Sequence, residues 1–194
     1  MNPPVAESLL SDGIVLLRPV EPSDYPSLRR MELSEHAALS WRHNGIHPSP
    51  ESYADNLWAG VHTHFLAFDT VTTTALGLLT TYDHNAVDRV ACFAAFRFTS
   101  DLSARTHFLR AFYLAMRYAF EASSIRKLYL ETPEYNYANL ASLVKRGALT
   151  VEGRLIEHKL SRGRYWDQVI LAATPTTLER LGDLIELTNR DRHA

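Results

Sequence analysis

The stretch FRFTSDLSARTHFLRAFYLAMRYAF, residues 96 to 120, has the pattern of a strand end, a short polar turn and a long helix. The helix is predicted from about Ser103 to Ser123. Its apolar residues recur with helical spacing and form one stripe: Phe108, Phe112, Ala115 and Ala119. Such a turn receives the free N–H groups of the helix N-terminus, and phosphate is their usual ligand. The junction therefore indicates an anion site, although the turn has none of the glycines that phosphate loops usually contain.

The whole chain has the composition of one soluble domain. At 194 residues it can bury a sizeable core, and 46% apolar with 22% charged residues is ordinary for a globular protein. A formal charge of −2 argues against a nucleic-acid partner, which requires a basic surface. The apolar runs are too short for a membrane span and no secretory signal is visible, so we expect no membrane partner and a cytoplasmic location. The single cysteine, Cys92, is expected to be a buried, inert thiol.

The order of the predicted elements indicates a mixed α/β (α+β) sheet with helices on its faces. A strand at 13–20 precedes two helices, within 21–36 and 50–62, and three strands at 63–70, 73–83 and 87–98. After the long helix come a strand at 126–133, a helix at 137–147, two strands at 148–160 and 165–173, and a C-terminal amphipathic helix. We expect about seven largely antiparallel strands in one domain, 13–173, followed by a helix and tail at 174–194.

Four stretches together resemble the GNAT superfamily of N-acetyltransferases, and most closely its branch that acetylates ribosomal-protein N-termini. DGIVLLRPVEPSDYPSL (12–28) is similar to the opening strand and helix of the family, and YAF (118–120) to the end of its long helix. Asn136 lies eleven residues before Gly147, as the family's asparagine does before a helix-ending glycine. VEGRLIEHKLSRGRYWDQVIL (151–171) is similar to the terminal hairpin of the branch. The resemblance covers roughly residues 13 to 173.

The resemblance implies an acyltransferase that moves an acetyl or other acyl group from a CoA thioester to an amine of a small molecule or a protein N-terminus. Acetyl-CoA, or another acyl-CoA, would lie in a gap between the fourth and fifth strands. Its pantetheine arm would bond to the fourth strand and its pyrophosphate to the start of the long helix. The residues that the resemblance assigns to the cofactor are Phe96, Arg97, Phe98, Leu102, Ser103, Ala104, Arg105, Thr106, Asn136 and Asn139.

The pyrophosphate turn departs from the pattern of the family. The two glycine positions fall on Ala104 and Thr106, and the leading basic residue falls on Asp101. Alanine still donates its N–H group where φ is negative, and Ser103, Arg105 and Thr106 could supply donors and charge. Alternatively, Asp101 or Ser103 only caps the helix. The protein would then be a GNAT-fold protein that no longer uses acetyl-CoA and acts as a ligand- or partner-binding module or with a repurposed cleft.

Acyl transfer to an amine requires a base, a polarised carbonyl and an acid for the leaving thiolate. Glu157 matches the glutamate of the terminal hairpin and is the predicted base, with a solvated strand carboxylate as the alternative. The family often has a serine three residues after its asparagine, and this position is occupied here by Asn139. The position of the tyrosine that serves as the acid in other branches is occupied by Leu143. Tyr135 and Tyr137 flank Asn136 and could replace this acid. Tyr135 is the predicted acid, with a packing role as the alternative.

The remaining polar clusters give weaker signals. His62 and His64 form a candidate metal pair, but no further ligand has suitable spacing, so no metal site is predicted. Trp41, His43 and His47 lie in the loop that, in the family, roofs the acceptor site. They predict an aromatic and polar acceptor pocket, with scattered surface residues as the alternative. The C-terminal helix either covers the sheet or forms the face of a homodimer.

Overall fold

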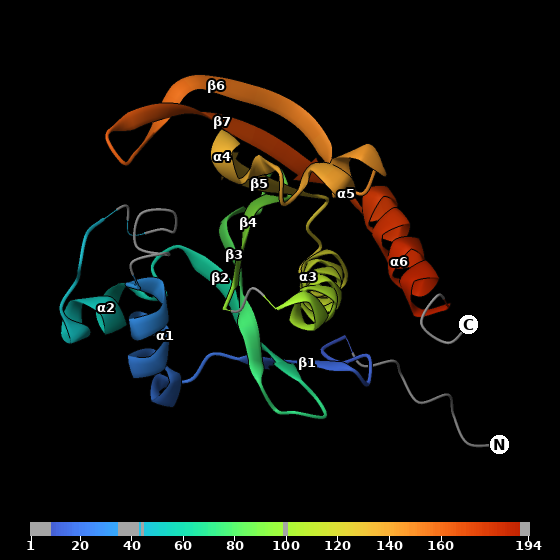
Figure 1. Cartoon of the computed structure of the whole chain (residues 1–194), viewed down its shortest axis with the longest axis horizontal. Helices are drawn as coiled ribbons and strands as arrows, with labels where there is room; N and C mark the ends of the chain where they lie inside the picture. The colour runs from blue at the N-terminus through green and yellow to red at the C-terminus, as the bar shows by residue number, and fades with distance from the viewer. Residues whose placement is uncertain (1–8, 35–42, 44, 99–100, 191–194) are drawn as a thin grey trace.

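The computed structural model describes residues 9–34, 43, 45–98 and 101–190. Within them the strands form one sheet of seven, in the order β1-β2-β3-β4-β5-β7-β6 (Figure 1). The strands are β1 (Val15–Pro19), β2 (Val61–Asp69), β3 (Ala75–Asn85), β4 (Val90–Arg97), β5 (Lys127–Pro133), β6 (Thr150–Ser161) and β7 (Arg164–Ala173). Neighbours run antiparallel except β4 and β5, which are parallel. The predicted mixed, largely antiparallel sheet is confirmed.

Helices cover both faces of the sheet. Figure 1 shows α3 on one side of β2–β4 and α1 with α2 on the other. The helices are η1 (Pro22–Asp24), α1 (Tyr25–Glu32), α2 (Pro50–Asn56), α3 (Leu102–Ala122), α4 (Glu134–Tyr137), α5 (Ala141–Lys145) and α6 (Pro175–Arg190). The single helix predicted at 137–147 is instead two short ones, because a turn at 138–140 separates α4 from α5. No helix in the described part of the chain combines the length and apolar character that crossing a bilayer requires.

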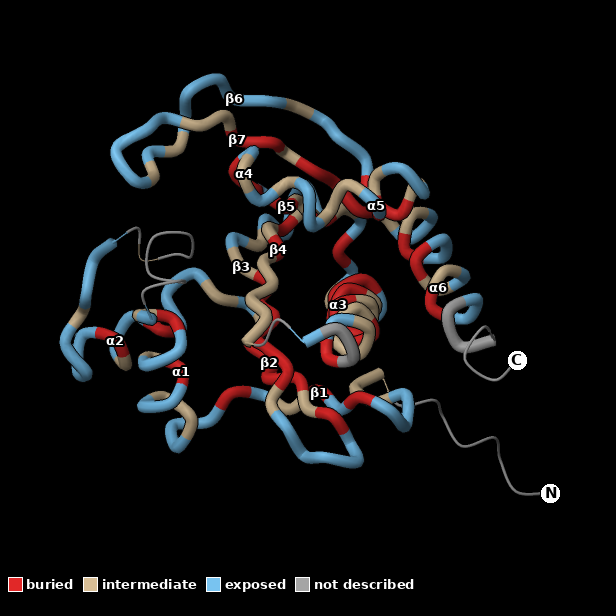
Figure 2. Tube along the Cα trace, in the orientation of Figure 1, coloured by how far each residue is buried: buried red, intermediate tan, exposed pale blue. Residues whose placement is uncertain are grey.

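Alternation of side chains along the strands separates two cores. Under α3 the main core includes Phe93, whose ring meets that of Phe112 edge-on at 5.3 Å. On the opposite face α1 and α2 bury a smaller cluster: Val20, Leu28, Tyr53, Leu57, Leu66 and Leu78. Figure 2 shows the buried residues concentrated on α3 and on the strands beside it. The face under α3 therefore contributes most of the buried apolar surface.

Gly77 in β3 allows α3 to approach the sheet closely. A Cβ atom at this position would collide with the Phe108 ring of α3 and with the carbonyl oxygen of Phe96 in β4. The backbone oxygen cannot move without disturbing the β3–β4 ladder. Glycine is therefore required here for space, since its φ is not positive.

Strands β4 and β5 pair only at their beginnings. The pairs are Val90↔Lys127, Ala91↔Leu128 and Cys92↔Tyr129. Beyond them β4 continues beside β3 as far as Arg97, and β5 continues beside β7 as far as Pro133. A gap therefore opens between residues 93–97 and 130–133, and it leaves one edge of β4 without a partner strand. This gap, which we call the splay, lies where the resemblance predicts it.

Candidate active site

The N-terminus of α3 lies at the open end of the splay, because β4 leads into this helix. The helix begins at Leu102, and its first intrahelical hydrogen bond runs from Arg105 N–H to Asp101 O at 3.0 Å. The N–H groups of residues 102–104 thus have no carbonyl within the helix to bond. These N–H groups and the positive end of the helix dipole together favour an anion at this position.

The two positions of missing glycine lie inside this helix rather than in a loop. Neither Ala104 nor Thr106 has positive φ, so neither needs the conformational freedom of glycine. Ala104 is buried in the main core, and its methyl group therefore packs against protein rather than against a ligand of the helix N-terminus. Arg105 is exposed beside it. The substitutions leave the N–H groups of the first turn available.

The other residues assigned to the cofactor flank the splay. Phe96 and Phe98 contact each other at 5.5 Å, are partly buried and pack on the smaller core. Arg97, between them, lies on the α3 face of β4. Across the gap, Asn136 Nδ2 donates to Thr132 Oγ1 at 3.2 Å, and Asn139 Nδ2 donates to Asn136 Oδ1 at 2.6 Å. Both asparagines are exposed at the carboxyl end of β5. The structure thus brings the predicted cofactor residues to both sides of one gap; the side chains of Leu102 and Ser103 lie outside its description.

A cavity of about 420 Å³ opens on the face of the sheet opposite α3, where β4 and β5 separate. Residues from strands β2 to β7 and from the segment before β2 line it: Ala59, Val61, Thr80, Tyr82, Asp83, Ala94, Glu131, Pro133, Lys159 and Gln168. Its size is that of a typical small-molecule site. The lining combines two carboxylates, an ammonium group, a phenol, an amide and a hydroxyl group. We call it the splay cavity.

Glu131 is the carboxylate of β5 in this cavity, and the sequence reasoning missed it. The Nε2 group of Gln168, on the neighbouring β7, donates to Glu131 Oε2 at 2.6 Å and holds the carboxylate in place. Glu131 is exposed because the splay leaves its side of the strand uncovered. The signal that could have found it is the alternation in KLYLETP, which places Leu128 and Leu130 on the buried face and Glu131 on the other.

Two neutral proton-bearing groups lie near this carboxylate. Burial raises the pKa of Tyr82, and the neighbouring Cys92, Glu131 and Asp83 raise it further. Burial also raises the pKa of Cys92, with Glu131 and Asp83 as additional causes. The phenol and the thiol therefore both stay protonated at neutral pH. The expectation of an unreactive thiol at Cys92 agrees with this shift, although the residue is half-buried rather than fully buried.

The two predicted catalytic residues lie outside the lining of the splay cavity. Glu157 is exposed, has φ 48°, and its N–H group donates to Asp167 Oδ1 at 3.0 Å. Tyr135 packs its ring edge-on against Trp166 at 5.3 Å, and its hydroxyl group is buried with no hydrogen-bond partner among the described residues. Their catalytic roles stay predictions. Leu143, at the position of the family's tyrosine acid, is buried in the main core.

The histidines of the predicted metal pair have different environments. His64 is buried, with Nε2 2.9 Å from Leu57 O and Nδ1 2.8 Å from Thr80 Oγ1. Both of its ring nitrogens are thus engaged by the protein. His62 is exposed, and its ring lies 4.7 Å from that of His84.

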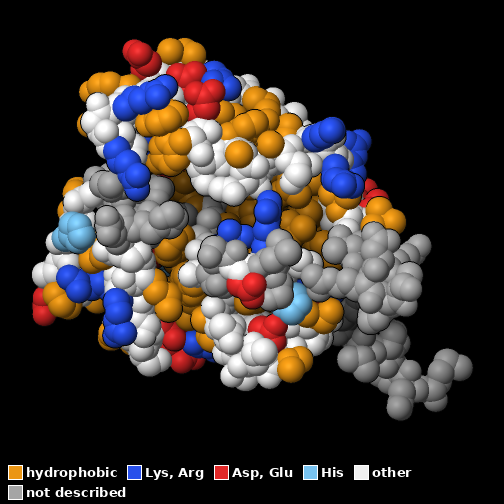
Figure 3. Space-filling model, viewed as in Figure 1, with side chains coloured by type: hydrophobic (Ala, Val, Ile, Leu, Met, Phe, Trp, Pro, Cys, Tyr) orange, Lys and Arg blue, Asp and Glu red, His pale blue; other side chains and the backbone are white. Residues whose placement is uncertain are grey.

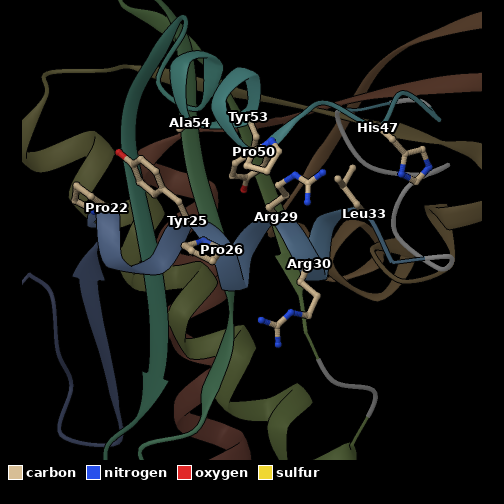
Figure 4. Close-up of a pocket in the computed structure, with 10 residues that line it drawn as sticks. All are labelled: Pro22, Tyr25, Pro26, Arg29, Arg30, Leu33, His47, Pro50, Tyr53 and Ala54. Atoms are coloured by element: carbon tan, nitrogen blue, oxygen red, sulfur yellow. The ribbon is translucent and has the colours of Figure 1, made fainter.

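A second cavity, of about 640 Å³, lies between α1 and α2 (Figure 4). Its described lining consists of Pro22, Tyr25, Pro26, Arg29, Arg30, Leu33, His47, Pro50, Tyr53 and Ala54. Arg29 extends towards α2, and its Nε and Nη2 groups donate to Pro48 O, whereas Arg30 extends from the opposite side of α1. His43 bonds to the buried Glu32 at 2.9 Å. Thus His47 lines a cavity and His43 bonds to the end of α1, while Trp41 lies outside the described residues.

The visible surface has no dominant charge. On the face seen in Figure 3, acidic and basic side chains are interspersed with apolar ones. The splay cavity, in contrast, brings charges of both signs together, with Asp83, Glu131 and Lys159 in its lining.

Comparison with known proteins identifies the fold. No protein-family model and no curated protein sequence matches the chain. The spermidine N-acetyltransferase of Vibrio cholerae, in complex with CoA and spermine, superposes with a TM-score of 0.71 and 20% identity over 86% of this chain and 99% of that one. A chimera of that enzyme with hSSAT gives 0.68 and 20% over 86% and 98%. A complex of the enzyme with manganese gives 0.63 and 21% over 83% and 92%. The chain therefore has the GNAT fold of these N-acetyltransferases.

Proposed function

We propose that the protein is an N-acyltransferase that moves an acetyl or other acyl group from CoA to an amine. One observation carries the proposal: the splay runs from a helix N-terminus suited to a pyrophosphate to a cavity that contains an oriented carboxylate. The similar fold of an enzyme solved with CoA and spermine supports both the donor and the amine acceptor. Within the GNAT fold, the terminal hairpin at 151–171 favours the branch that acetylates ribosomal-protein N-termini.

The donor would lie along the free edge of β4. Backbone groups of residues 93–97 that face the splay would bond to the pantetheine arm, and Asn136 and Asn139 would contact it from the other side. The N–H groups of residues 102–104 would bind the pyrophosphate, with Arg97 and Arg105 adding positive charge. In this proposal the turn is a glycine-free form of the family's pyrophosphate loop. Ala104 and Thr106 are tolerated in it because both are helical.

The acceptor would react in the splay cavity. An amine arrives protonated, and Glu131 accepts its proton either directly or through water. The neutral nitrogen then attacks the thioester carbon and the C–S bond breaks. The nitrogen releases its second proton to solvent as the amide forms, and the CoA thiolate takes up a proton as it leaves. Tyr135 is the predicted donor of that proton. Glu157 remains the second candidate for the base, because the hairpin motif assigns it that role.

Calorimetric titration with acetyl-CoA, together with amine-dependent release of CoA, tests the function. We expect acetyl-CoA to bind, and Glu131→Gln to lower kcat about 100-fold while leaving the affinity for acetyl-CoA unchanged. Glu157→Gln is the matched variant, since it makes the same chemical change outside the splay cavity. Full activity in Glu131→Gln together with a loss of activity in Glu157→Gln would mean that Glu157, and not Glu131, is the base. A folded protein that does not bind any acyl-CoA would support the alternative, a GNAT-fold module with another ligand.

A further inference from the structure

We infer that the splay cavity selects acceptors that carry a carboxylate a few bonds from the reacting amine, such as amino acids, rather than polycationic amines. The inference rests on the proposed acyl transfer and names its substrate class. It depends on which charged side chain β6 contributes to the cavity. An irregularity in the pairing of β6 with β7 determines that this side chain is Lys159.

The ladder is regular on either side of a bulge. Leu155 pairs with Gln168, and Lys159 pairs with Trp166, so four steps along β6 match two steps along β7. In a ladder without the bulge, the residue opposite Trp166 would be Glu157. The two extra residues instead put Lys159 in that position, and Lys159 lines the splay cavity. Because of the bulge, the position beside the cavity is occupied by the basic residue Lys159 instead of the acidic residue Glu157.

Asp167 holds the bulge in this form. Its Oδ1 atom accepts the N–H group of Glu157 at 3.0 Å, and its Oδ2 atom accepts Arg154 Nη1 at 2.9 Å. These bonds lower the pKa of Asp167, and the bond from the Glu157 N–H group has the largest effect. Asp167 is therefore ionised at neutral pH. Arg154 also donates to Glu134 at 2.7 Å, which ties the bulge to α4 at the end of β5. The position of Lys159 is therefore a built feature of the hairpin.

The charges of the cavity then match a zwitterion. Glu131 and Asp83 supply negative charge for the ammonium form of the acceptor amine, and Lys159 supplies positive charge for a carboxylate. A polyamine would instead place a second ammonium group in a small cavity that already holds the Lys159 side chain. Like charges at such separations repel, so the ammonium group of Lys159 disfavours a second cation beside the reacting one.

The test compares acceptors that differ only in the carboxylate. With saturating acetyl-CoA, kcat/KM is measured for amino acids, for the corresponding amino-acid amides and for spermidine. We expect each free amino acid to exceed its amide about tenfold, the effect of one favourable charge contact in a partly exposed site, and spermidine to be the poorest acceptor. Calorimetric binding of the same compounds to the protein–CoA complex gives the same comparison independently of turnover.

Variants of Lys159 show whether this residue is responsible. Lys159→Gln should remove the preference for free amino acids, and Lys159→Glu should reverse it, both with unchanged affinity for acetyl-CoA. Lys145→Glu on α5 is the control, since it makes the same charge change at an exposed position outside the cavity.

Equal use of free amino acids and their amides by the native protein, or a preference that Lys159→Glu leaves intact, would overturn the inference. Rapid acylation of spermidine would overturn it too while upholding the proposed function, whereas a protein that binds no acyl-CoA would refute the proposed function itself.

Discussion

Two consecutive residues of β5 show how the two faces of the sheet differ. Leu130 is buried under α3, whereas Glu131 faces the splay cavity and is oriented by Gln168. The same alternation in β4 buries Phe93 against α3 and leaves Ala94 in the cavity wall. Stability and chemistry are thus divided between alternate positions of the same strands, so that polar groups can face a cavity without weakening the main core.

The largest expected effect compares Leu130→Ala with Glu131→Gln. Truncating Leu130 leaves a space in the main core, and we expect the free energy of unfolding to fall by about 2–5 kcal/mol. Glu131→Gln keeps the shape of an exposed side chain and should change this free energy by less than about 0.5 kcal/mol. Urea denaturation of both variants measures the difference. Similar losses in the two would mean that the faces are not divided in this way.

A second comparison uses two glycines in strands. Gly77→Ala should lower the free energy of unfolding by about 1–3 kcal/mol, because the new methyl group meets the Phe108 ring and a backbone oxygen. At Gly153 a Cβ atom would lie an ordinary 3.6 Å from Ile170 Cδ1, so Gly153→Ala is the matched control and should be neutral or slightly stabilising. Thermal unfolding distinguishes the two. Equal midpoints would show that α3 does not press on the sheet at Gly77.

The smallest effect concerns the thiol on the cavity side of β4. Because burial and then Glu131 and Asp83 raise the pKa of Cys92, its thiolate fraction at neutral pH is below that of a free cysteine. Alkylation by iodoacetamide should therefore be slow and should reach half its maximal rate only above the ordinary thiol range. Glu131→Gln removes one cause of the raised pKa and should speed the reaction severalfold at pH 8. Since Cys92 is the single cysteine, the rate is read directly from the whole protein. An unchanged alkylation rate in Glu131→Gln would mean that Glu131 does not raise the pKa of Cys92.

The sequence predicted the fold because the relevant signals are local. Apolar alternation gave the strands, and the stripe along 103–123 gave the helix that became α3. The resemblance places the family's glycine loop at residues 101–106, but the helix starts at Leu102, close to the predicted start at Ser103. Both positions of the missing glycines are therefore helical, where glycine is not required.

The splay cavity was harder to predict because non-local pairing builds it. Glu131 becomes accessible only because β4 and β5 stop pairing after Cys92 and Tyr129. Lys159 lies opposite Trp166 and lines the cavity because the bulge, in which the Glu157 N–H group bonds to Asp167, shifts the register of β6. Neither register can be inferred from one strand alone, and a regular hairpin would have favoured Glu157.

Hydrogen exchange of the backbone amides, with and without CoA, tests most directly whether the donor lies in the splay. We predict that saturating CoA slows exchange at the amides of 93–97 that face the splay and at those of residues 102–104, while exchange in β1, at the far edge of the sheet, is unchanged. Protection confined to the cavity between α1 and α2, or bound CoA with no protection at 93–97, would contradict it.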